Sequence, residues 1–189
     1  VQMMGQTIQL LNATDGATLA TWPAWVVSFG EQLQFSPDGK TLLSSGLGVP
    51  VQRWRVADGV LLGLLPTYLN GAALYRDDDV AVEGLTFSAD GQMLGVAADA
   101  GPHLWNVIDG VPLLLPTGHD PDYGGGAVVA HSSDGRWVAS GGYDEIRIWR
   151  AGDLAPVTAI QMPFGYVYDL AFSPDGQTLA SASYRDQYN

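Results

Sequence analysis

The sequence predicts an all-β fold made of about four repeats, each a small antiparallel sheet. Four similar turns carry this prediction, and their glycines lie 52, 44 and 41 residues apart: Phe35–Gly39, Phe87–Gly91, His131–Gly135 and Phe172–Gly176. A tryptophan follows three of the turns at a nearly constant offset, which is 15, 14 and 14 residues after the glycine for Trp54, Trp105 and Trp149. Self-similarity at such a period is typical of a repeat architecture.

The first part of the chain is expected to form short strands, because its Val, Ile and Leu residues come in brief runs bounded by turns. These strands are Ile8–Leu11, Ala17–Thr21, Gln32–Ser36, Thr41–Ser45 and Val51–Val56. Asp15-Gly16 and Pro37-Asp38-Gly39 form tight turns, since proline presets φ and glycine accepts a positive φ. Trp22–Trp25 is expected to be loop, because Pro23 cannot donate to a sheet ladder.

The later repeats follow the same plan, and no run of residues shows the 3.6-residue period of a helix. Pro66–Val80 is the longest interruption, and Thr117–Gly126 is a second loop. The expected strands are Val60–Leu65, Val82–Ser88, Gln92–Ala97, His103–Val107, Val111–Leu115, Ala127–His131, Trp137–Ser140, Glu145–Arg150, Pro156–Gln161, Val167–Ser173 and Thr178–Ser183.

Composition excludes several classes of function. The 189 residues include 20 acidic and 8 basic side chains, and the net charge of −12 argues against a nucleic-acid or anionic-membrane partner. The absence of cysteine excludes disulfides and thiol catalysis, and it fits a reducing, cytoplasmic compartment. No run of eighteen apolar residues predicts a transmembrane helix. The lysine-poor composition, rich in glycine and alanine, suggests a bacterial source.

The repeated pattern resembles the WD40 family of β-propellers. The stretch Val111–Arg150 matches it best, with Gly118-His119 early, Ser132–Gly135 in the middle and Ile146–Arg150 at the end. The chain departs from the family where Arg55, Asn106 and Arg150 follow the tryptophans, since the family usually places aspartate there. The resemblance implies a WD40-type β-propeller fragment of about four four-stranded antiparallel blades, the first and last incomplete.

The whole chain, 1–189, is expected to form one propeller region. It divides into a partial blade at 1–16, blades at 17–57, 58–108 and 109–151, and an incomplete blade at 152–189. Leu11 takes the tryptophan position of its repeat, and the sequence stops after the turn at Asp186, so a fragment of a longer protein is expected. An alternative is a closed four-bladed propeller, in which Ile8–Leu11 completes the last blade.

A structural hydrogen-bond network is implied by the same resemblance. In the family it links a histidine, a strand serine, a turn aspartate and the tryptophan, and His119, Ser140, Asp144 and Trp149 match these positions. The network is favoured over a role of His119 as a base or metal ligand, because no second histidine lies nearby in sequence. Other repeats keep less of it: Ser44 accompanies Trp54, but Val96 takes the serine position beside Trp105. His131 replaces the usual phenylalanine and is expected to be a half-buried core residue.

A partner-binding face is also implied, because such propellers bind proteins through their loops. That face would be built from Trp22, Trp25, Tyr68, Tyr75, Arg76, Asp77, His119, Tyr123, Tyr143, Tyr166, Tyr184 and Arg185. Aromatic residues with arginine often carry the energy of an interface. The acidic surround predicts a protein or peptide partner of basic character.

The resulting prediction of function is a non-catalytic protein–protein interaction scaffold or sensor module of a larger WD40-repeat protein. The alternative is a propeller-based enzyme or ligand-binding domain with carboxylates near the central channel. No catalytic residue, cofactor or metal site is predicted. Asp77–Asp79 is expected to be a solvated loop, with cation binding or docking of a basic partner as the alternatives. Asp120–Gly124 lacks the third carboxylate and closing glutamate of a calcium loop, and Gly124–Gly126 lacks a phosphate-binding spacing.

Overall fold

The computed structural model describes residues 6–24, 32–46, 49–65, 68–69, 72–73, 82–98, 101–107, 110–113, 119 and 128–184. Within these ranges the chain is all β, and none of the described residues is helical. The strands are antiparallel to their neighbours throughout. This confirms the predicted fold class.

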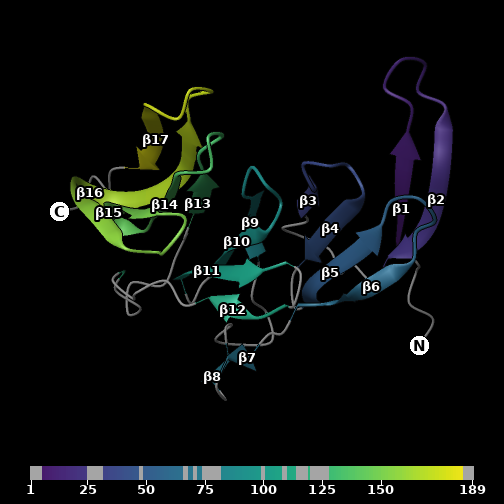
Figure 1. Cartoon of the computed structure of the whole chain (residues 1–189), viewed down its shortest axis with the longest axis horizontal. Helices are drawn as coiled ribbons and strands as arrows, with labels where there is room; N and C mark the ends of the chain where they lie inside the picture. The colour runs from purple at the N-terminus through teal and green to yellow at the C-terminus, as the bar shows by residue number, and fades with distance from the viewer. Residues whose placement is uncertain are drawn as a thin grey trace.

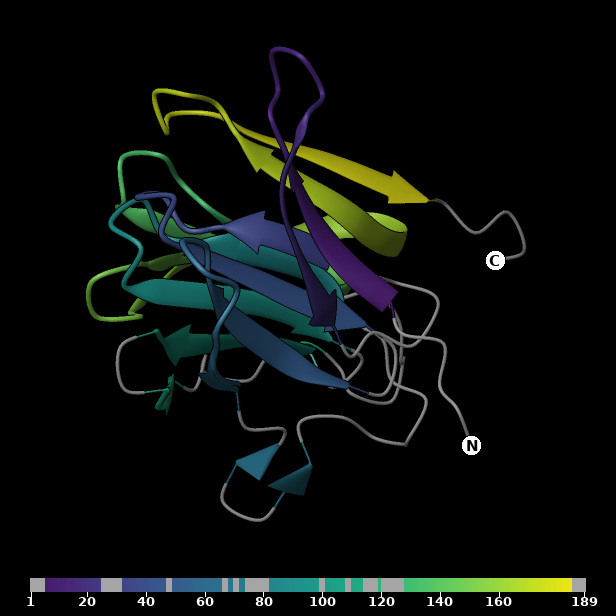
Figure 2. The ribbon, with the colours of Figure 1, turned by 90° about the vertical axis from the view of Figure 1, so that its right-hand side faces the viewer.

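The strands assemble into three larger sheets and two two-stranded pairs. The pair β1 (Gln6–Leu11) and β2 (Thr18–Ala24) precedes the first larger sheet, and the hairpin β7 (Tyr68–Leu69) and β8 (Ala72–Ala73) projects from the body of the molecule (Figures 1 and 2). The first sheet contains β3 (Gln32–Phe35), β4 (Thr41–Gly46), β5 (Val49–Arg55) and β6 (Leu61–Leu64). The second contains β9 (Val82–Phe87), β10 (Met93–Ala98), β11 (Gly101–Asn106) and β12 (Pro112–Leu113). The third contains β13 (Val128–His131), β14 (Trp137–Gly141), β15 (Tyr143–Arg150), β16 (Pro156–Phe172) and β17 (Leu179–Tyr184).

The sheets follow one another along an open arc (Figure 1). The pair β1–β2 lies at one end of the arc and β17 at the other, and neither end strand is hydrogen-bonded to the opposite end. The alternative of a closed four-bladed ring is therefore wrong for this structure. In the closed ring β1 would pair with β2 on one edge and with β17 on the other, and the structure contains the first of these ladders but not the second.

The sequence repeats and the sheets are offset by one strand. Each repeat as divided above begins with an outer strand, such as 61–64 or 112–113. In the structure that strand pairs with the tryptophan strand before it, so it belongs to the preceding sheet. The inner strands β3, β9, β13 and the second half of β16 contact one another in that order and line the inside of the arc.

The repeated turns have one construction, which explains their sequence. In Ser36–Gly39 the Ser36 hydroxyl donates to Asp38 Oδ1 at 2.7 Å, and the same carboxylate accepts from the Lys40 N–H at 3.0 Å. The three later turns repeat these bonds through Ser88 and Asp90, Ser132 and Asp134, and Ser173 and Asp175. The glycine of each turn has φ between 67° and 72°, a region that favours glycine.

The hydrophobic core consists of four clusters, three at junctions between neighbouring sheets and one within the third sheet. Trp54 packs with Ile8, Trp22 and Leu42, which joins β1–β2 to the first sheet. Trp105 joins the second sheet to the first, and Trp149 joins the third to the second. The fourth cluster packs β14 and β15 on β16. The periodic tryptophans thus connect each sheet to the one before it.

The segment Trp22–Ala24 corrects one expectation, since it belongs to β2 and is not a loop. Pro23 is tolerated because β2 is an edge strand with β1 as its only described partner. Trp22 is 6% exposed in the core and so does not contribute to a partner-binding face. Its indole lies so close to Gly59 that a Cβ there would fall 2.7 Å from the ring, which fixes glycine at that position.

The expectation of two separate strands at Pro156–Gln161 and Val167–Ser173 is also wrong. A single strand, β16, runs through both, pairing first with β15 as an outer strand and then with β17 as an inner strand. The carboxylate of Asp144 accepts a hydrogen bond from the Gly165 N–H at 2.8 Å where the strand crosses over. This bond lets the third sheet continue into the next unit without an intervening loop.

Candidate functional site

A buried polar centre lies in the third sheet, where His119 meets two neighbouring strands. Its Nε2 is 2.6 Å from Oγ of Ser140 on β14, and its Nδ1 is 3.5 Å from Oε1 of Glu145 on β15. Glu145 also accepts from Arg147 Nε at 2.8 Å and from Gln161 Nε2 at 3.3 Å. The His119–Ser140 contact is part of the network expected from the sequence.

The aspartate expected in that network lies elsewhere. Asp144 has φ of 60° and directs its carboxylate to Gly165, and the next residue, Glu145, faces the imidazole instead. The alternation of side chains along a strand could have predicted that Glu145 and not Asp144 faces His119. Every second residue of β15 lies on the same face, and Glu145 shares its face with Arg147 and Trp149. His119 itself is held against the backbone at Gly142, where a Cβ would lie 2.4 Å from Nδ1.

Ser140, His119 and Glu145 are connected in the same order as the serine, histidine and acid of a hydrolase triad, in which the serine is the nucleophile. Ser140 is 0% exposed, and a nucleophile must be reached by the carbonyl that it attacks. Burial lowers the pKa of His119, with Glu145 raising it and Arg147 lowering it to a smaller extent, which favours the neutral imidazole at pH 7. The arrangement therefore fixes the position of His119 and Ser140 within the sheet.

The equivalent positions of the other sheets show how the repeats differ. In the first sheet the Trp54 indole N–H donates to Ser44 Oγ at 2.9 Å. In the second, Val96 stands in place of the serine, and Trp105 Nε1 is buried with no hydrogen-bond partner. In the third, Trp149 is 2% exposed in the core. Only the first and third sheets thus retain a serine that binds a neighbouring polar side chain at this point.

The turn carboxylates lie at one end of the inner strands, and their pKa values fall below the ordinary range. The Ser132 hydroxyl, the Arg136 N–H and the Arg136 guanidinium together lower the pKa of Asp134 to about 2. Among the described residues, no group of three histidine or acidic side chains could hold a metal ion. No helix within the described ranges is long and apolar enough to span a bilayer.

Three of the predicted contact residues come together in a tyrosine row, defined here as Tyr143, Tyr166 and Tyr184. Tyr143 on β15 pairs with Tyr166 on β16, and Tyr166 pairs with Tyr184 on β17, so the three side chains project from the same face of the sheet. The Tyr143 and Tyr166 rings meet edge to face, with centroids 5.0 Å apart and planes at 66°. Tyr184 is 59% exposed, and the other two are partly exposed.

The remaining predicted contact residues are placed as follows. Trp25, Tyr75, Arg76, Asp77, Tyr123 and Arg185 lie outside the described residues. Tyr68 begins the short strand β7, and only its backbone is described. The structure thus brings three members of the predicted face together, and sequence reasoning missed Tyr168, which is 61% exposed on a bulge of β16 beside them.

Comparison with known proteins agrees with this architecture. The family model described as "WD domain, G-beta repeat" matches residues 115–150 and 156–187. An uncharacterized WD repeat-containing protein of the cyanobacterium Synechocystis sp. is 35% identical over 94 residues. That match covers 49% of this chain and 26% of the relative, so the chain spans about a quarter of the relative's length. Repeated turns, four-stranded sheets and both matches support one conclusion: the chain carries repeats of the WD40 family, which the family model matches at residues 115–150 and 156–187.

Proposed function

We propose that this chain is a non-catalytic protein-interaction module that contacts its partner through the tyrosine row. The observation that carries the proposal is the direct pairing of Tyr143, Tyr166 and Tyr184 across three adjacent strands. Aromatic side chains on a rigid sheet offer a large contact area at a small cost in conformational entropy. WD repeats suggest the same general class of function.

The strands beneath the row support its role as a fixed contact surface. Tyr143 and Tyr166 flank the bond between Asp144 and Gly165, which holds the crossover of β16. Val167, the next residue, is 0% exposed and belongs to the core cluster beneath. The row therefore needs little rearrangement before it binds, which lowers the cost of association.

The partner proposed is a peptide segment rich in lysine and arginine. The chain carries a net charge of −12, and Asp144 and Asp169 lie on the strands that bear the tyrosines. A cation over the face of a tyrosine ring gains energy from the ring's quadrupole, and nearby carboxylates add to it. The same acidic surface speeds the approach of a basic partner at low ionic strength.

The test is a selection of random twelve-residue peptides displayed on phage, followed by fluorescence anisotropy with the enriched peptides. We expect lysine and arginine to be enriched, and Tyr166→Ala to weaken binding at least about tenfold, as for the central residue of an interface. Tyr168→Ala is the control, because Tyr168 is 61% exposed, more than Tyr166, but lies on the bulge between the paired positions. It should weaken binding by less than about threefold.

Two results would overturn the proposal. One is enrichment of acidic or uncharged peptides, which would remove the charge argument. The other is unchanged affinity of Tyr166→Ala for a basic peptide while its unfolding curve matches that of the parent chain.

A further inference from the structure

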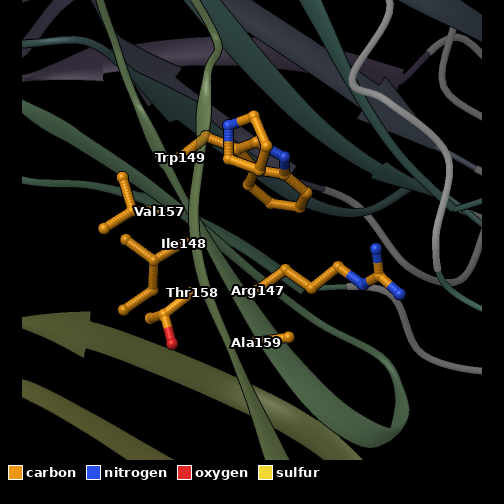
Figure 3. Close-up of a pocket in the computed structure, with 7 residues that line it drawn as sticks. Arg147, Ile148, Trp149, Val157, Thr158 and Ala159 are labelled. Carbon is orange, nitrogen blue, oxygen red and sulfur yellow. The ribbon is translucent and has the colours of Figure 1, made fainter.

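A hollow lies at the outer rim of the third sheet, and no residue of the tyrosine row is among those that line it (Figure 3). Its volume is about 160 Å³. It is lined by residues of β15 and the first half of β16: Arg147, Ile148, Trp149, Pro156, Val157, Thr158 and Ala159.

The hollow follows from the way these two strands pair. Trp149 pairs with Pro156 and Ile148 with Thr158, so Val157 is an extra residue that makes a bulge between them. The next pair sets the small Ala159 opposite the long Arg147, which leaves space beside the backbone. Trp149 is 2% exposed and fixed in the core, so the hollow rests on a rigid wall.

The strand beside the hollow also has an open edge. Over residues 156–161, β16 pairs with β15 on one side, whereas its pairing with β17 begins only at Tyr166. Its other side therefore has no strand partner within the described part of the chain, and alternate N–H and C=O groups there are available. Val157 and Ile160 on this edge are 49% and 43% exposed.

We propose that this rim binds an extended peptide, which adds a strand to the outer edge of β16 and places one apolar side chain in the hollow. Peptides that extend a sheet gain affinity from main-chain hydrogen bonds and specificity from pockets for alternate side chains. The hollow fits one such side chain, because a cavity of about 150 Å³ accommodates benzene. It is too small for a typical small-molecule ligand, whose pockets measure about 300–1,000 Å³.

Charge favours an apolar anchor over a charged one. The only ionisable side chain lining the hollow is Arg147, and its guanidinium is paired with Glu145. The proposed rim site therefore differs in chemistry from the tyrosine row and does not depend on it. A single anchor of the size of leucine or phenylalanine is the expected specificity determinant.

The test is an NMR titration of the 189-residue chain with three host peptides of alternating threonine and glutamine. The peptides are seven residues long and carry phenylalanine, leucine or alanine at the centre. We expect saturable shifts at the amides of β15 and the first half of β16, and affinities for the phenylalanine and leucine peptides at least about fivefold above that for alanine. The shifts should be small at Tyr166 and Tyr184.

Two variants separate the hollow from the strand edge. Ala159→Phe fills the hollow and should abolish the preference for a large central residue, while Ile160→Ser changes an edge residue outside the lining and should retain it. Loss of the preference only in Ala159→Phe supports the proposal, provided that both variants unfold like the parent chain. No saturable shift at millimolar peptide, or equal affinities for the three peptides, would overturn it. Because the titration contains no basic peptide, neither result bears on the proposal that the tyrosine row binds a basic partner.

Discussion

His131 offers the sharpest test of how these repeats are built. It ends the inner strand β13 at the position that Phe35, Phe87 and Phe172 take in the other repeats. Its Nδ1 and Nε2 atoms are both buried without a hydrogen-bond partner. Desolvation lowers the pKa of His131 to about 4, although the nearby carboxylate of Asp90 opposes the shift. We predict that His131→Phe stabilises the protein.

The gain in the free energy of unfolding expected for His131→Phe has two parts. At pH 7.5 the imidazole is neutral in both states, and replacing its unsatisfied polar atoms should raise the free energy of unfolding by about 1–3 kcal/mol. Below pH 6.5 the unfolded state binds a proton that the folded state, with a pKa of about 4, does not. Stability must then fall as the pH drops, by about 2 kcal/mol between pH 7.5 and 5 for this residue. His131→Phe should remove that part of the loss.

The assay is urea unfolding followed by tryptophan fluorescence at pH 7.5 and pH 5, with the parent chain and His131→Phe measured side by side. The contributions of the other histidines and of the carboxylates cancel in the difference between the two proteins. Phe87→His is the reverse control and should introduce a loss of the same sign, because Phe87 is 8% exposed at the equivalent position. Parallel pH dependence of the parent and His131→Phe would refute the reasoning.

Two further predictions each compare the same substitution at two residues of one type that differ in their contacts. Ser44→Ala should cost about 1–3 kcal/mol, because it leaves a buried indole N–H without its acceptor, whereas Ser45→Ala should cost little, because the Ser45 hydroxyl is buried without a partner. Equal losses in the urea assay would contradict this difference. Gly142→Ala should displace His119, which would lie 2.4 Å from the new Cβ, and cost about 1–3 kcal/mol, while Gly152→Ala meets no atom within 4 Å and should be nearly neutral. A crystal structure of the first variant with His119 unmoved would argue against it.

The repeat pattern could be predicted from the sequence because its signals are local. A serine, an aspartate and a glycine close each turn through bonds within five residues, so the motif is visible in a single copy of the repeat. The tryptophan offset follows from the lengths of the two strands after the turn. These features gave the fold class and most of the strands.

The predictions from the sequence were wrong where contacts between residues far apart in the chain determine the local structure. Trp22 and Pro23 have the composition of a loop, but the burial of Trp22 against Gly59 draws both residues into β2. The continuous strand β16 depends on the bond from Gly165 to Asp144, which are 21 residues apart. The resemblance to the WD40 family assigned Asp144 to the network of His119, and the positive φ that turns its carboxylate toward Gly165 is not visible in the sequence.

The tyrosine row was only partly accessible to sequence reasoning. The resemblance to the propeller family placed Tyr143, Tyr166 and Tyr184 on one face, but their direct pairing depends on the register across β15, β16 and β17. The hollow beside β16 could not have been predicted, because it results from a bulge and from the size of one alanine.

The central claim is that the rigid frame and the contact surface are carried by different residues. It is tested by measuring, for His119→Ala and Tyr166→Ala, both the free energy of unfolding and the affinity for a selected basic peptide. The account predicts that His119→Ala loses stability and keeps its affinity at temperatures where it is folded, whereas Tyr166→Ala loses affinity and keeps most of its stability. The account would be contradicted if folded His119→Ala lost affinity while Tyr166→Ala bound normally. That result would place the contact surface at the buried polar centre.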